Sequence, residues 1–267
     1  MNLRKYISIW TRLAQMAFMM QVANRLASLG WLGGKCVRLI FFVIFIAAIF
    51  QHVPQVGGYS LTEIAFFFLT FNIVDILSQL FFRGIYMIGR DIREGDMDFY
   101  LIQPVNPLFR IASNLVDFLD FLTLIPVLIA LAYILPHTLA GLTVTQSLTR
   151  VGLYLLLCAN GVIIAFSVHV AIASLTVRTQ QMENTIWLYR DLMSLGRFPT
   201  DVYPKTIQYV LTLALPIAVM VTIPTKALIG LLTVKTTIAA CAISALWLYG
   251  SIRMWKSALK YYCSVSS

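Results

Sequence analysis

The sequence predicts an all-α integral membrane protein. Of its 267 residues, 60% are hydrophobic and only 12% are charged, whereas a soluble domain carries roughly 25% charged residues. So apolar a chain has too little polar surface to cover one soluble core. Its apolar runs are continuous, which favours helices over a β-barrel with alternating segments. At about 20 apolar residues per span, we expect about six spans in a single transmembrane domain over residues 1–267.

Residues 1–28 are expected to form an amphipathic helix that lies in the headgroup plane. Arg4, Lys5, Arg12 and Arg25 alternate with apolar residues at helical spacing. A plain cytoplasmic tail is the alternative interpretation. The segment lacks the compact apolar core and the small-residue cleavage site of a secretory signal peptide.

Five apolar runs predict spans directly. They cover residues 37–50, with a start as early as residue 29, and residues 61–82, 111–135, 148–175 and 236–255. A short basic tail follows the last run, and no long linker divides the chain.

Residues 176–235 allow two assignments of the remaining span. Hydropathy alone places it at 207–223, which puts seventeen of the twenty Lys and Arg residues on one side. Alternatively, 183–198 is a short, polar fifth span that contains Arg190 and Asp191, which could pair with each other or with Asp75. A re-entrant hairpin on the far face, over 199–232, then follows, marked by Pro199, Pro204, Pro216 and Pro224, and fourteen Lys and Arg residues remain cytoplasmic. Under both assignments the positive-inside rule predicts a multi-pass protein of the plasma (inner) membrane with both termini in the cytoplasm.

The stretch GRDIREGDMDFYLIQPVNPLFR, at 89–110, combines charge with apolar residues between two spans. It holds four of the eleven acids, Asp91, Glu94, Asp96 and Asp98, together with Arg90, Arg93, Phe99 and Tyr100. This pattern predicts a compact surface that docks a soluble partner, and a solvated loop is the alternative. Pro104 and Pro107 are expected to end its last helix.

Few charged residues fall inside the predicted spans. A charge facing lipid at mid-depth costs about 2.5–3.5 kcal/mol, so Asp75, Asp117 and Asp120 are expected to face the protein interior, a watery cavity or a basic partner. Asp75 lies deeper than the other two and has Asn72 as a polar neighbour, so both are candidates for a substrate path. Asp117 and Asp120 share a helix face. They form either a polar vestibule to that path or an anchor near the headgroups.

Catalytic and nucleotide-binding motifs are absent from the sequence. The Gly-Gly-Lys-Cys at 33–36 lacks the spacing and the Ser or Thr of a P-loop, so the chain is not expected to hydrolyse ATP by itself. Its histidines and cysteines are too dispersed for a metal site, and we expect no bound cofactor. Its basic residues lie at span ends, where they favour lipid headgroups rather than nucleic acid as partners.

Two motifs in order resemble a known family. They are GRDIREGDMDFYLIQPVNPLF at 89–109, and RFPTDVYP at 197–204 followed by LPIAVMVTIP at 215–224. With the span layout, they resemble the permease subunits of ABC-2 type transporters, in the branch whose members are close to this chain in length. The resemblance implies that residues 90–102 form a cytoplasmic coupling helix seated on a separate ATP-binding subunit, which would carry ATP and Mg. It also implies that 199–232 is an extracellular gate hairpin, and that two copies, or this chain and a sister permease, enclose the substrate path.

The expected function is therefore the membrane subunit of an ATP-driven exporter. An ion-coupled secondary transporter that uses Asp75, Asp117 and Asp120 as a proton relay is the alternative, although the chain lacks a clear internal repeat of the kind common in such transporters. A scaffold or a membrane enzyme is a third interpretation. An apolar, modestly acidic lumen would suit amphipathic or cationic organic molecules.

Overall fold

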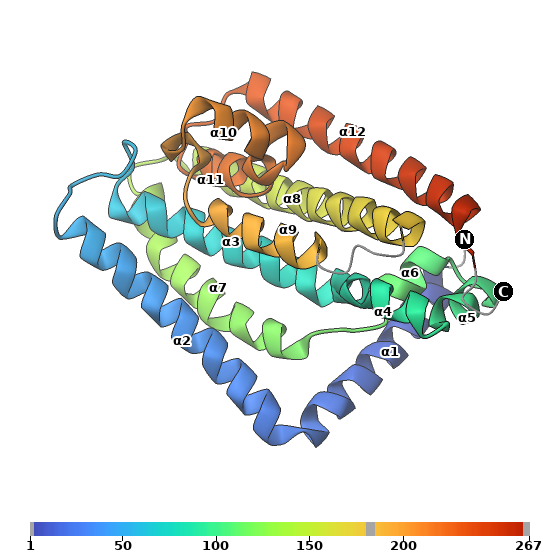
Figure 1. Cartoon of the computed structure of the whole chain (residues 1–267). Helices are drawn as coiled ribbons and strands as arrows, with labels where there is room; N and C mark the ends of the chain where they lie inside the picture. The colour runs from blue at the N-terminus through green and yellow to red at the C-terminus, as the bar shows by residue number, and fades with distance from the viewer. Residues whose placement is uncertain (1–2, 180–184, 264–267) are drawn as a thin grey trace.

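A computed structural model describes residues 3–179 and 185–263, and the chain there is built almost entirely of helices. Five helices are long and apolar enough to cross a membrane, and a bent pair of shorter helices would bring the number to six. Figure 1 shows α3, α8 and α12 running side by side, with the short helices α4, α5 and α6 gathered at one end of the bundle.

The bundle core consists of α3 (Leu61–Phe82) and α8 (Val144–Thr179). The most apolar window of each is 72% and 56% buried, against 6% for α2 and 11% for α7. The outer helices therefore turn most of their apolar surface toward the membrane or a partner. The predicted span at 61–82 matches α3, which begins with a capping box between Ser60 and Glu63.

The N-terminal region forms two helices that meet at an elbow. Helix α1 (Leu3–Ala23) ends one residue before α2 (Arg25–Phe50), which is longer than the predicted span at 37–50. Figure 1 shows the two helices diverging from this elbow. Ala14 and Ala17 of α1 pack against Leu80 and Val116, so this helix contacts the bundle.

The third span begins later than predicted. Residues 107–112 form the separate helix α6 (Pro107–Ala112), and α7 (Phe118–Leu139) begins after a short break. The carboxylate of Asp117 accepts hydrogen bonds from the backbone N–H groups of Leu119 and Asp120, both at 3.1 Å, and so caps a new helix. The expectation that Asp117 lies inside a span over 111–135 was therefore wrong.

At neither position predicted for the fifth span does the structure have a straight membrane helix. Over 183–198, the structure has α9 (Thr185–Met193) and a 3-10 turn (Ser194–Arg197), while Glu183 and Asn184 lie outside the described residues. Over 207–223, the helices spanning Lys205–Ala214 and Ala218–Leu228 are bent by 85°. Pro216 lies in the bend, where it cannot donate a backbone hydrogen bond.

The last two helices complete the fold. The second half of the bent pair ends with α11 (Ile223–Leu228), and α12 (Val234–Ala258) contains the predicted span at 236–255. Helix α12 packs along α8. On α8, Gly161 lets the bent segment approach, because a Cβ there would lie 2.7 Å from the carbonyl oxygen of Met220.

Candidate functional site

The segment at 89–110 folds into three short helices beyond the end of α3. A 3-10 turn (Arg83–Met87) leads into α4 (Ile88–Arg93), which is followed by α5 (Asp96–Ile102) and then α6. Gly95 adopts a φ of +81°, which allows the chain to turn between α4 and α5. Pro107 occupies the first turn of α6, so it begins that helix, where its missing N–H costs nothing.

The predicted docking residues divide into an exposed set and an internal set. Phe99 is 62% exposed and Ile102 is 79% exposed. Arg90 and Glu94 form an exposed ion pair at 3.6 Å on α4, and Arg93 is also exposed. These side chains present an apolar surface with charges beside it, which we call the coupling surface: Arg90, Glu94, Phe99 and Ile102.

Asp91 and Tyr100 belong to the internal set. Asp91 is fully buried, and the Tyr100 hydroxyl donates to its carboxylate at 3.4 Å. Asn114 donates to the same hydroxyl at 3.0 Å, and the Arg110 guanidinium lies 4.9 Å from the Tyr100 ring centroid. Burial and, to a smaller extent, the nearby charge of Asp91 raise the pKa of Tyr100 to about 12. The pair therefore holds α4, α5 and α6 together rather than facing a partner.

Both ends of the chain hold this segment in place. The Lys5 ammonium donates to the carbonyl oxygen of Pro104 at 2.6 Å, and the Tyr6 hydroxyl accepts from the backbone N–H of Asn106 at 3.3 Å. From the C-terminal end, the Tyr262 hydroxyl donates to Asp98 at 2.9 Å. Burial and the hydrogen bond to Asp98 raise the pKa of Tyr262 to about 12. Asp96, the first residue of α5, is partly exposed.

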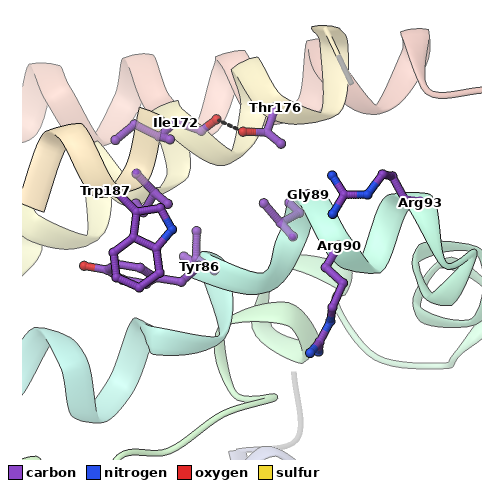
Figure 2. A pocket seen from close by; sticks show the side chains of 10 residues that line it. Tyr86, Gly89, Arg90, Arg93, Ile172, Thr176 and Trp187 are labelled. Carbon is purple, nitrogen blue, oxygen red and sulfur yellow. Dashed lines mark hydrogen bonds between the residues drawn. The ribbon is translucent and has the colours of Figure 1, made fainter. Parts of the chain in front are cut away.

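A small cavity of about 140 Å³ lies where α4 meets α8 and α9 (Figure 2). Arg90 and Arg93 line it from α4, and the rings of Tyr86 and Trp187 meet edge to face with centroids 5.3 Å apart. Gly89 lies on the wall between them. The segment at 89–110, which we call the coupling segment after its proposed role, is therefore in contact with the bundle core as well as with the chain termini.

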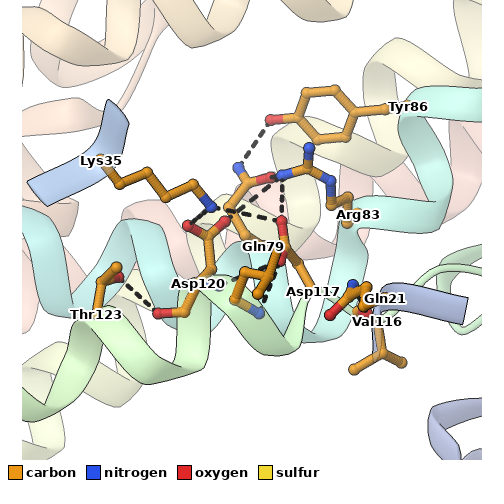
Figure 3. Close-up of polar contacts among 10 residues, drawn as sticks. Gln21, Lys35, Gln79, Arg83, Tyr86, Val116, Asp117, Asp120 and Thr123 are labelled. Atoms are coloured by element: carbon orange, nitrogen blue, oxygen red, sulfur yellow. Dashed lines mark hydrogen bonds and ion pairs between the residues drawn. The ribbon is translucent and has the colours of Figure 1, made fainter. Parts of the chain in front are cut away.

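Two buried carboxylates and two partly buried cations meet at the end of α3 nearest to this segment, and we call these four residues the inner cluster (Figure 3). Arg83 lies 2.8 Å from Asp117 and 3.5 Å from Asp120. Lys35 of α2 lies 3.5 Å from Asp117 and also pairs with Asp120. No side chain of the four is more than 13% exposed. Gln79 extends the cluster by donating to Tyr86 at 3.0 Å.

The inner cluster gives the two acids one of the environments considered for them. Asp117 and Asp120 face basic partners, which neutralise them within the protein. Removing one partner of a buried ion pair costs about 3–5 kcal/mol, because it leaves an uncompensated charge. Sequence reasoning missed Lys35 and Arg83, because each lies on a different helix from the acids. The only hint in the sequence was that a cation stands at the end of each of two neighbouring apolar runs, 37–50 and 61–82.

Asp75 and Asn72 face a cavity that adjoins the inner cluster. This cavity has about 20 Å³ of free volume, enough for a water molecule. Asp120 lines it too, so the structure brings three of the four predicted path residues together, and Asp117 joins them through its ion pairs. Arg38 and Arg197, which sequence reasoning did not select, also line the cavity.

The charges around this cavity differ from the expected acidic lumen. Lys35, Arg38 and Arg197 line it along with only two acids. The Arg197 guanidinium lies 5.5 Å from the ring centroids of both Phe42 and Phe71. Among the described residues, neither Asp75 nor Arg190 forms an ion pair within 4.0 Å, so the pairings considered for Arg190 do not form.

The predicted gate segment packs at the opposite end of α3. Tyr59, just before α3, donates to Asp201 at 2.7 Å, and Lys226 of α11 pairs with the same carboxylate oxygen at 2.7 Å. We call Tyr59, Asp201 and Lys226 the outer cluster. Burial and Asp201 raise the pKa of Tyr59 above its usual range. The four prolines mark the ends and the bend of the local helices: Pro199, Pro204, Pro216 and Pro224.

In the ranges 3–179 and 185–263, no three His, Cys, Asp or Glu side chains gather where they could hold a metal ion. The polar clusters described above are made of cations paired with carboxylates and of tyrosine hydroxyls. Such groups serve ion pairing and helix contacts.

Five long apolar helices in the described ranges, with a possible sixth span from the bent pair, define a multi-pass membrane protein. The chain belongs to the ABC-2 transporter family: the family described as "ABC-2 family transporter protein" matches residues 37–266. Members of this family are permeases that work with ABC ATP-binding subunits. The match covers the coupling segment, both acids of the inner cluster and the bent segment, whereas α1 and Lys35 precede it. No curated protein matches the chain.

Proposed function

We propose that this chain is the permease subunit of an ATP-driven exporter. Two copies, or this chain and a sister permease, would enclose the substrate path, and separate subunits would bind ATP and Mg. The observation that carries this proposal is the coupling surface, which exposes Phe99 and Ile102 at one end of the bundle. Exposed apolar side chains with polar residues around them are typical of surfaces that bind a partner.

The coupling segment suits the transmission of movement because it is firmly tied to the rest of the chain. Asp91 and Tyr100 fix its three helices to one another, while Lys5 and Tyr262 tie it to the two termini. A partner that pulls on Phe99 would therefore move α4–α6 as one unit. Arg83 begins the 3-10 turn that leads into α4 and belongs to the inner cluster, so this movement would reach the buried ion pairs.

In this proposal the inner cluster closes the cytoplasmic end of the path, and Asn72 and Asp75 line the path above it. The segment at 199–232 forms the extracellular gate, held by the outer cluster. The excess of cations around the cavity removes the charge argument for a cationic substrate. The proton-relay alternative loses support for a related reason, since Asp117 and Asp120 are neutralised by Lys35 and Arg83.

The docking proposal is tested by co-purification with the ATP-binding partner. The double substitution Phe99→Asp and Ile102→Asp should abolish the complex while the permease still inserts in the membrane, because it places two charges in an apolar contact. The conservative double variant Phe99→Leu and Ile102→Leu is the matched control and should retain the complex. A full yield of complex from the Asp variant would refute the docking role.

The orientation of the gate is tested by labelling a single cysteine. Lys205 is exposed, whereas Thr200 is only 4% exposed, so Lys205 is the better position. In a chain whose four native cysteines are replaced, Lys205→Cys should react with an impermeant maleimide in intact cells. Reaction only after lysis would place this segment in the cytoplasm.

A further inference from the structure

An open groove runs between the α1–α2 elbow and the first turns of α7. Its free volume is about 530 Å³. Apolar side chains form most of its walls, and all the polar ones come from the elbow side. The apolar members are Phe18, Val22, Leu29, Phe118, Leu119, Phe121 and Leu122, and the polar members are Gln21, Arg25 and Ser28.

The charges of this region favour an anionic occupant. Residues 1–62 contain six Lys and Arg residues and no acid, since the first acid in the chain is Glu63. Arg25 is exposed at the groove, and the described lining contains no carboxylate. The acids of the inner cluster, although close in sequence to Phe118, are neutralised by Lys35 and Arg83. The positive charge of Arg25 is therefore available to bind an anion in the groove.

Gln21 adds a requirement for a hydrogen-bond donor. Its Nε2 donates to the carbonyl oxygen of Val116 at 3.1 Å (Figure 3), which fixes the orientation of the amide. Its Oε1 is buried and has no hydrogen-bond partner among the described residues. The neighbouring Ser28 hydroxyl cannot serve, because it donates to the Gln21 carbonyl oxygen at 2.6 Å. A buried acceptor without a donor is rare and indicates a missing partner.

We propose that this groove binds an anionic glycerophospholipid whose headgroup carries hydroxyl groups. An acyl chain lies along the apolar walls, and the phosphate accepts hydrogen bonds from Arg25. Gln21 Oε1 is covered in the structure, so a headgroup hydroxyl donates to it after the side chains that cover it move aside. One molecule of this chemistry meets all three features of the groove. The proposal rests on the chain being a membrane protein, and it does not depend on the direction of transport or on the ATP-binding partner.

This lipid would stabilise the elbow from which α1 reaches the coupling segment. Helix α1 contacts that segment through Lys5 and Tyr6 at its N-terminal end and meets the groove through Phe18 and Gln21 near its C-terminal end. A bound lipid would therefore support the position of α1 between the membrane and the coupling segment.

The test is lipid binding to the purified, delipidated full chain, measured by native mass spectrometry with equal amounts of phosphatidylglycerol and phosphatidylcholine. Phosphatidylglycerol has the net charge and the hydroxyl donors, whereas phosphatidylcholine has neither. We expect the wild type to prefer phosphatidylglycerol. Arg25→Gln should weaken its binding about five-fold, and Gln21→Met should reduce the preference between the two lipids.

A matched control and a groove-filling variant separate this site from general lipid adhesion. Arg12→Gln removes the same charge from an exposed position of α1 outside the groove and should leave binding unchanged. Leu122→Trp, at a position that is 46% exposed, should exclude the acyl chain and lose the tightest-bound lipid. Equal losses for Arg25→Gln and Arg12→Gln would overturn the proposal. So would cross-linking between two copies through Leu122→Cys that added phosphatidylglycerol does not reduce.

Discussion

The inner and outer clusters hold the same helix at its two ends, yet they differ in strength. Helix α3 has 22 residues, about 33 Å at 1.5 Å per residue. At one end, Lys35, Arg83, Asp117 and Asp120 form four ion pairs and are nearly excluded from solvent. At the other end, Lys226 and Asp201 form one ion pair, with side chains that are 25% and 36% exposed.

The difference in exposure changes the free energy that is needed to separate the ion pairs at each end. An exposed pair is screened by water and contributes about 0–1 kcal/mol, so this ion pair by itself adds little to holding the outer end closed. The buried charges of the inner cluster cannot separate without losing several kcal/mol. A transporter built in this way would need its energy input at the inner end, which is where the coupling segment lies.

The largest effect is expected from breaking the inner cluster. Arg83→Met should lower the free energy of unfolding by about 3–5 kcal/mol, because it leaves a buried carboxylate without its cation. Thermal unfolding in detergent, followed by tryptophan fluorescence, would measure the loss. Adding Asp117→Asn should recover part of it, since Lys35 and Asp120 then remain as a neutral pair. Equal stability of Arg83→Met and wild type would mean that the cluster is open to water.

A smaller effect is expected at the close contact between α8 and the bent segment. Gly161→Ala should cost about 1–3 kcal/mol, because its Cβ would lie 2.7 Å from the Met220 carbonyl oxygen. The same unfolding measurement applies. Gly152→Ala is the control, since a Cβ at this α8 position meets nothing within 4 Å. An equal response of the two variants would show that the bent segment is not packed on Gly161.

The smallest effect is expected at the outer cluster. Lys226→Met should change the free energy of unfolding by about 0–1 kcal/mol, because the pair is partly exposed and Tyr59 still donates to Asp201. If the outer end is the readily opened one, this variant should change transport activity more than stability. A loss as large as that of Arg83→Met would remove the proposed difference between the two ends.

Much of the fold was accessible from the sequence. The continuous apolar runs predicted the membrane class, α3 was predicted at its observed ends, and α12 contains the predicted last span. The mixed charge of 89–110 marked a distinct segment between two spans, which folds as separate short helices. These features depend on residues that are neighbours in the chain, and hydropathy and helix-ending prolines report on such neighbours directly.

Other features were decided only by the tertiary structure. Lys35 and Asp120 are 85 residues apart, and Arg83 and Asp120 are 37 apart, so no local pattern could pair them. Hydropathy favoured a straight span over 207–223, where packing against Gly161 and the bend at Pro216 give two short helices. The sequence alone determined which segments leave water, because transfer free energy is a sum over neighbouring residues. Which buried charges meet, and where α1 turns, was decided by contacts between distant helices, because a charge inside the protein is stabilised by the partner nearest in space.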